Sequence, residues 1–132
     1  MASNVLEVSL SDTPLVTPEK NSPPETGGVV DFWGVVRQTE NGGKISGIKY
    51  EAHRPMAEHQ LHAIAEAAAA RFDLHEIRIR HRLGFVSTGE ASLFVRVGCQ
   101  HRAEAFRATQ WVVDELKKRA PIWKHPKPEV AL

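Results

Sequence analysis

The 132-residue sequence has one cysteine, Cys99, and no apolar run that approaches the roughly 18 residues needed for a membrane-spanning helix. A single cysteine excludes an intrachain disulfide framework and favours a reducing compartment, so we expect a cytoplasmic protein. The N-terminal residues lack a basic stretch followed by an apolar block, and therefore predict no secretory signal. The single cysteine and the lack of a long apolar run or a signal-like N-terminus together predict a globular protein that makes no membrane contact.

The net charge of the chain is also small. The formal charge is +1 at pH 7, so no overall field marks the chain as a nucleic-acid binder. The charges are unevenly distributed, because residues 1–74 hold six Lys and Arg against ten Asp and Glu, whereas residues 75–132 hold eleven against six. A basic second half favours an anionic ligand or an acidic partner, unless the two halves fold together and the asymmetry disappears.

Hydrophobic periodicity predicts six main elements. Residues 1–26 are rich in Pro, Ser and Thr and predict an irregular N-terminal arm, although the alternation in VLEVSL could form a short edge strand. Residues 27–132 are expected to form one domain, with regular structure beginning at Gly27 and a turn at Asn41-Gly42. Strands are predicted over 27–37, 44–52, 75–84 and 90–99, and helices over 55–72 and 102–119. This ββαββα order predicts an α+β fold in which helices cover one face of a mostly antiparallel sheet.

Two pairs of residues could carry chemistry but lack a third partner. Cys99 and His101 are spaced like a thiol–imidazole pair, but no orienting group is visible nearby, and a small buried cysteine is the more common case. His59 and His62 are one helical turn apart without a third ligand, so we predict no metal site.

Two basic groups lie at the ends or faces of elements. His101 and Arg102 fall where a strand gives way to a helix, and a helix N-terminus attracts anions; they form either a phosphate or carboxylate site or a surface cap. A strand face carries Arg78, Arg80 and Arg82, which could bind a nucleic-acid backbone. No aromatic residues interleave with these arginines, so a solvated face or a subunit contact is the other interpretation.

The segment RAPIWKHPK, residues 119–127, follows the last predicted helix. Pro121 ends that helix, and Ile122 and Trp123 are expected to dock on an apolar surface. Docking would hold Lys124 and return it towards Lys117 in the last helical turn. Lysines there often only complement the helix dipole, but two that converge could transfer protons.

Five segments together resemble the large, catalytic subunit of molybdopterin synthase: GGVVDFWGVVR, IKYEAHRPMAE, HRLGFVSTGEAS, QHRAEAF and LKKRAPIWK, spread over roughly residues 27–125. The resemblance implies an α/β-hammerhead type of fold with a small additional antiparallel sheet. It also implies a sulfurtransferase of molybdenum cofactor biosynthesis. Sulfur would come from the thiocarboxylated C-terminal Gly-Gly of a small ubiquitin-like subunit and pass to cyclic pyranopterin monophosphate, giving the dithiolene of molybdopterin.

The implied assembly is a heterotetramer, with a central homodimer of this chain and a small subunit at each end. We expect no metal, no further cofactor and no nucleic-acid partner. The resemblance implies catalytic roles for Lys117 and Lys124 and places Phe32 at the pocket for the tail of the small subunit. Substrate contacts are implied for both lysines and for Val35, Val36, Arg37, His101, Arg102, His125 and Pro126.

The sequence departs from this family at several positions. The family often has a glutamate two residues after its second lysine, where Pro126 stands here, so a salt bridge from that glutamate would be lost. His53 stands where a tyrosine is common. The alternative function is a non-catalytic module that binds RNA or an acidic protein through the face of Arg78, Arg80 and Arg82.

Overall fold

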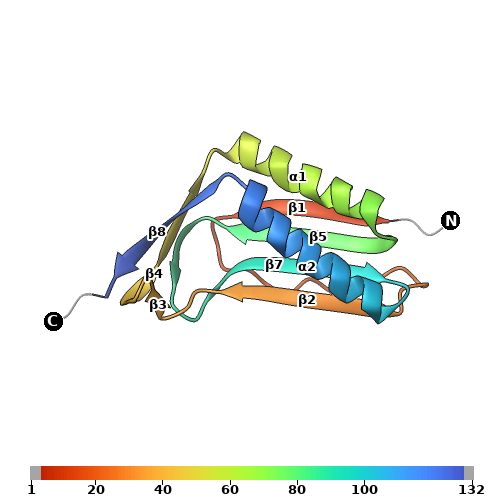
Figure 1. Cartoon of the computed structure of the whole chain (residues 1–132), viewed down its shortest axis with the longest axis horizontal. Helices are drawn as coiled ribbons and strands as arrows, with labels where there is room; N and C mark the ends of the chain where they lie inside the picture. The colour runs from red at the N-terminus through yellow and green to blue at the C-terminus, as the bar shows by residue number, and fades with distance from the viewer. Residues whose placement is uncertain (1–3, 130–132) are drawn as a thin grey trace.

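The computed structural model describes residues 4–129, which form two sheets and two helices. The first sheet has four strands in the order β1 (Val5–Ser11), β5 (Leu74–Arg82), β7 (Ala91–Cys99) and β2 (Gly28–Val35). Strand β1 runs parallel to β5, and the other pairs are antiparallel. Helices α1 (Arg54–Arg71) and α2 (Arg102–Arg119) both cover one face of this sheet (Figure 1). The predicted α+β class and both predicted helices are confirmed.

The main core lies between the helices and the first sheet. Alternate residues of β5 and β7 point towards the helices, because side chains of a strand alternate between its two faces. In α1, Ala65 and Ala68 are fully buried and let the helix backbone approach closely. The core also contains Leu61, Ile64, Ile77, Ile79, Val95, Val97, Val112 and Leu116.

A smaller sheet lies at one end of the first, at the left of Figure 1. Its central strand is β4 (Gly43–Ala52), which pairs antiparallel with β3 (Thr39–Glu40), β6 (Gly84–Ser87) and β8 (Ile122–Pro128). A separate buried cluster consists of Ile45 and Ile48 of β4, Val86 of β6 and Val36. The small additional antiparallel sheet implied by the resemblance is therefore present.

Two glycine-containing positions shape the path of the chain at this second sheet. Asn41 and Gly42 have φ values of 53° and 82°, as a two-residue hairpin turn requires, so the predicted turn between β3 and β4 is confirmed. Gly84 has φ 86° and is the first residue of β6, so that β5 ends at Arg82 where one continuous strand was expected over 75–84. At Gly84 the chain leaves the first sheet and enters the second.

The N-terminal arm corrects one prediction. Regular structure begins at Val5 in β1, not at Gly27, and the possible edge strand in VLEVSL is confirmed. Residues 12–27 contain no helix or strand. They lie on the sheet face opposite the helices, because Arg96 on that face donates hydrogen bonds to the carbonyl oxygens of Glu19, at 2.9 Å, and Pro18, at 3.4 Å.

The arginine strand face is neutralised by carboxylates. Arg80 binds Glu7 at 2.8 Å, and Arg78 binds Glu7 at 3.2 Å and Glu76 at 2.6 Å. Arg82 similarly pairs with Glu90 at 2.7 Å. Part of the basic second half is therefore paired with the acidic first half, and the face offers little free charge for RNA. The structure gives no support to the alternative binding module.

Candidate active site

A cavity of about 670 Å³ lies where the end of α2 meets the small sheet and the ends of β2 and β5. Its size suits a small-molecule ligand. The structure brings six of the predicted site residues into its lining: Phe32, Val35, Val36, Arg37, Lys117 and Lys124. Strand β2 and the residues just after it supply four of them, and the two lysines come from separate elements.

Helix α2 ends before Pro121, and β8 then returns the chain along β4. The backbone N–H of Ala120 closes the last helical turn on Leu116, and Lys124 pairs in register with Tyr50 of β4. The segment after α2 is therefore a strand, held by its pairing with β4. Pro126 and Pro128 are tolerated because β8 is an outer strand.

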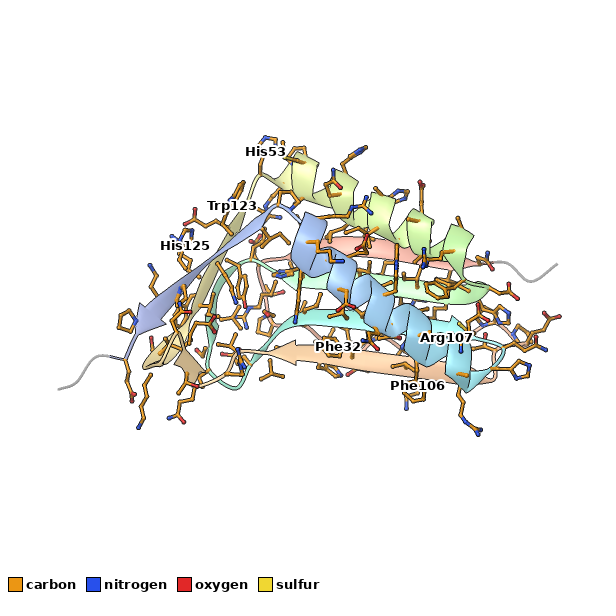
Figure 2. The ribbon with its side chains drawn as sticks, in the orientation of Figure 1. Phe32, His53, Phe106, Arg107, Trp123 and His125 are labelled. Atoms are coloured by element: carbon orange, nitrogen blue, oxygen red, sulfur yellow. The ribbon has the colours of Figure 1, made fainter. Side chains whose placement is uncertain are left out.

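The docking prediction for this segment is half right. Ile122 and Lys124 line the cavity, but Trp123 is 55% exposed. Residues alternate along β8, so Trp123 and His125 project to the other side of the strand (Figure 2). His125 lies 4.0 Å from Glu51, and the cavity lining includes neither His125 nor Pro126.

Glu40 is the acidic residue in the lining and was not predicted. Its Oε1 accepts a hydrogen bond from Lys124 Nζ at 3.2 Å, and its Oε2 lies 4.0 Å from Arg37 Nη2. The only sequence signal for this region was the turn predicted at Asn41-Gly42. A hairpin turn there would fix the position of the residue just before it, Glu40.

His81 is a second lining residue that sequence reasoning missed. Burial lowers the pKa of His81, which favours the neutral ring. Its Nδ1 lies 2.8 Å from the carbonyl oxygen of Arg82, which can only accept, so Nδ1 carries the proton and Nε2 keeps a free lone pair. The ring packs edge-on against Tyr50 with centroids 5.1 Å apart. His81 lies near the end of β5, beyond the residues of this strand that pack in the main core, and this position brings it to the cavity.

His101 and Arg102 lie at the opposite end of α2 from Lys117. Lys117 follows Arg102 by fifteen positions, and at about 1.5 Å of rise per residue they are roughly 22 Å apart along the helix. Both are exposed, and His101 makes no side-chain cap for the helix. Within one chain they do not belong to the cavity.

Cys99 is buried in the main core and does not belong to the cavity. Burial, followed by the nearby carboxylates Glu104 and Asp73, raises the pKa of its thiol to about 11. A thiol of this kind is protonated at neutral pH and is a poor nucleophile. The structure therefore favours the structural interpretation of this cysteine.

Neither a metal centre nor a membrane span is visible in residues 4–129. No group of three or more His, Cys, Asp and Glu side chains there could hold a metal ion. Neither α1 nor α2 combines the length and apolar character that crossing a bilayer requires.

The fold and the site together define a class: an α+β protein with a half-apolar cavity whose cationic side chains suit a small anionic ligand. The chain belongs to the MoaE protein family, whose sequence model matches residues 10–119. It is 43% identical over 99 residues to the molybdopterin synthase catalytic subunit of Pyrococcus abyssi, covering 75% of this chain and 67% of that protein. It is 32% identical over 125 residues to the subunit of the same name from Thermoplasma volcanium, covering 94% and 91%. The structure is similar to the crystal structure of molybdopterin synthase from Staphylococcus aureus, with a TM-score of 0.81 and 28% identity over 92% of this chain and 91% of that one.

Proposed function

We propose that this chain is the catalytic subunit of a molybdopterin synthase, a cytoplasmic sulfurtransferase of molybdenum cofactor biosynthesis. One observation carries the proposal: in a member of the MoaE family, Lys117 of the last helix and Lys124 of the last strand line one cavity together with Arg37. The substrate would be cyclic pyranopterin monophosphate. The sulfur would come from the thiocarboxylated Gly-Gly end of a small ubiquitin-like subunit.

The cavity supports this chemistry through charge and shape. Substrate phosphate and thiocarboxylate are both anions, and Arg37, Lys117 and Lys124 offer charge-assisted hydrogen bonds to them. Phe32 and the apolar side chains beside it would receive the tail and exclude water. As each sulfur attacks, a C–S bond to the substrate forms, a C–O bond of the substrate side chain breaks, and the oxygen leaves with a proton. A lysine ammonium can supply that proton. Water would then cleave the bond between the sulfur and the acyl carbon of the tail, so that the sulfur stays on the substrate and the tail leaves as a carboxylate.

The reaction is tested by reconstitution. The purified chain is mixed with thiocarboxylated small subunit and the cyclic pterin, and the dithiolene product is measured after oxidation to a fluorescent form. We expect product only when all three components are present. Lack of product with a fully thiocarboxylated partner would reject the proposed function.

The assembly we propose is a heterotetramer built on a homodimer of this chain. If His101 and Arg102 bind the same substrate as Lys117, the roughly 22 Å between them within one chain requires that they come from a second copy. A homodimer would provide that copy, with one small subunit bound to each protomer. We expect light scattering at micromolar concentration to give a dimer, and a monomer that persists after the small subunit is added would contradict this.

Arg102→Ala is expected to weaken substrate binding more than it slows chemistry. Arg102 would contact an anionic group of the substrate, and the loss of a charge-assisted hydrogen bond costs about 1.5–3 kcal/mol, or roughly 10- to 150-fold in Kd. Calorimetry of the cyclic pterin with the dimer measures the change. Arg107→Ala is the control, because Arg107 is also exposed on α2 (Figure 2). Equal Kd values for the two variants would remove Arg102 from the site.

A further inference from the structure

Glu40 is a largely buried carboxylate that bridges two cations of the cavity. Its side chain is only 14% exposed, and each of its oxygens faces a different partner. Oε1 accepts from Lys124 Nζ at 3.2 Å, and Oε2 lies 4.0 Å from Arg37 Nη2. A carboxylate in a cavity for anions works against ligand binding, so its presence calls for a function other than binding.

The backbone holds Glu40 firmly in this position. Glu40 pairs with Gly43 across the Asn41-Gly42 turn, and the N–H of Ile45 donates to the carbonyl oxygen of Gln38 at 2.8 Å. Strands β3 and β8 both pair with β4 but not with each other. The contact from Glu40 to Lys124 therefore links two strands that no backbone hydrogen bond connects.

The two cations differ in how tightly Glu40 holds them. The Lys124 contact is a hydrogen bond, whereas the Arg37 contact is long and the arginine side chain is 80% exposed. Lysine carries its charge on a flexible four-carbon stem, which needs a fixed partner to keep one position. Arg37 can turn towards an arriving anion while Lys124 stays in place. Lys117 has no carboxylate within 4.0 Å among residues 4–129, so Glu40 distinguishes the two lysines.

We propose that Glu40 is a positioning residue for the reaction: it holds the ammonium group of Lys124 at the cavity and leaves Arg37 free to bind an anionic group of the substrate. This inference rests on the proposed function of the same cavity. It assigns opposite effects to one side chain. The negative charge of Glu40 weakens binding of an anionic substrate, and its hydrogen bond to Lys124 speeds the chemical step.

The test separates these effects by measuring the single-turnover rate constant and the Kd of the cyclic pterin in Glu40→Gln and Glu40→Ala. We expect Glu40→Ala to react about 10- to 100-fold more slowly, since displacement of a catalytic group by about 1 Å can cost 100-fold. Glu40→Gln keeps an acceptor for Lys124 and should lie between Glu40→Ala and the native protein. The Kd should decrease in both variants, because each removes the negative charge that opposes binding of the anionic substrate.

Glu51→Gln is the matched control. Glu51 is also a carboxylate of the small sheet, 3.3 Å from Lys49, but it does not line the cavity. Its replacement should change neither the rate constant nor the Kd. An unchanged rate constant in Glu40→Ala, or a slower reaction accompanied by proportionally weaker binding, would overturn the proposal, because the second pattern indicates a generally damaged cavity.

A measurement that needs no activity separates this proposal from the proposed function. Lysine acetylation by acetic anhydride, followed by mass spectrometry, reports how available each side-chain amine is to react, because an ammonium group held by a carboxylate does not react. In Glu40→Ala we expect several-fold faster labelling of Lys124 and no change at Lys127, which is exposed on the same strand. Unchanged labelling of Lys124 would overturn the positioning role. If the native protein made no dithiolene, the proposed function would fail, and the labelling would still decide whether Glu40 holds Lys124.

Discussion

Lys117→Ala is expected to lower the single-turnover rate of product formation by about 100- to 10,000-fold, the usual contribution of general acid or base catalysis. The substitution should leave the fold intact. Lys117 lies in the last turn of α2 beside Leu116, and alanine there favours the helix and leaves the core unchanged. Any interaction with the helix dipole contributes at most about 1 kcal/mol at an exposed site. Binding of the small subunit should be unaffected.

Lys118→Ala is the internal control for Lys117. Lys118 points about 100° around the helix and lies 3.8 Å from Glu115. It does not line the cavity. We expect Lys118→Ala to react at the native rate. If the two variants were equally active or equally impaired, the catalytic assignment of Lys117 would be wrong. A fall in the thermal midpoint of more than a few degrees in Lys117→Ala would contradict its placement.

Arg96→Met is expected to give the largest loss of stability, about 3–5 kcal/mol, as for other broken buried ion pairs. Arg96 has no exposed surface, and its Nε and Nη2 donate to Asp31 at 2.6 Å and 2.9 Å. It also binds the carbonyl oxygens of Glu19 and Pro18. Methionine would leave the Asp31 carboxylate and both carbonyls without this partner. Urea denaturation followed by circular dichroism measures the free energy of unfolding.

A surface ion pair provides the comparison for Arg96. Arg54 pairs with Asp12, and both side chains are largely exposed. Arg54→Met is expected to cost no more than about 1 kcal/mol, because solvent screens exposed pairs. A loss below 1 kcal/mol in Arg96→Met would show that the arm and Asp31 gain little from this arginine. Faster proteolysis near Glu19 in Arg96→Met would support release of the arm.

The sequence predicted those features that depend on neighbours along the chain. Helix α2 has the predicted bounds, because Pro121 ends it and its apolar spacing is helical. The Asn41-Gly42 turn was visible because few other residues adopt two successive positive φ values. The family resemblance predicted the residues of the site, and Phe32, Arg37, Lys117 and Lys124 among them line one cavity.

Pairing between distant segments was not visible in the sequence. The proline-containing segment after α2 is strand β8 only because β4 is available beside it, and no local pattern reveals that partner. The contact between Glu40 and Lys124 spans 84 positions of the chain for the same reason. Arg78 and Arg80 of β5 looked free because both pair with Glu7 of β1, a strand that pairs with β5 over a similar distance. Which carboxylates lie beside these arginines depends on the order of the strands in the sheet. The alternation of polar and apolar residues within one strand does not specify that order.

The parallel pairing of β1 with β5 sets an order of events during synthesis. Val5 pairs with Glu76, 71 positions later, so β1 has no partner when it leaves the ribosome. At roughly 5–20 residues per second, it waits about 4–14 s for β5 to be made. During this time its apolar residues Val8 and Leu10, which later pack against the main core, remain open to other chains. Lys124 of β8 pairs with Tyr50 of β4, so the cavity forms only after β8 has also been made.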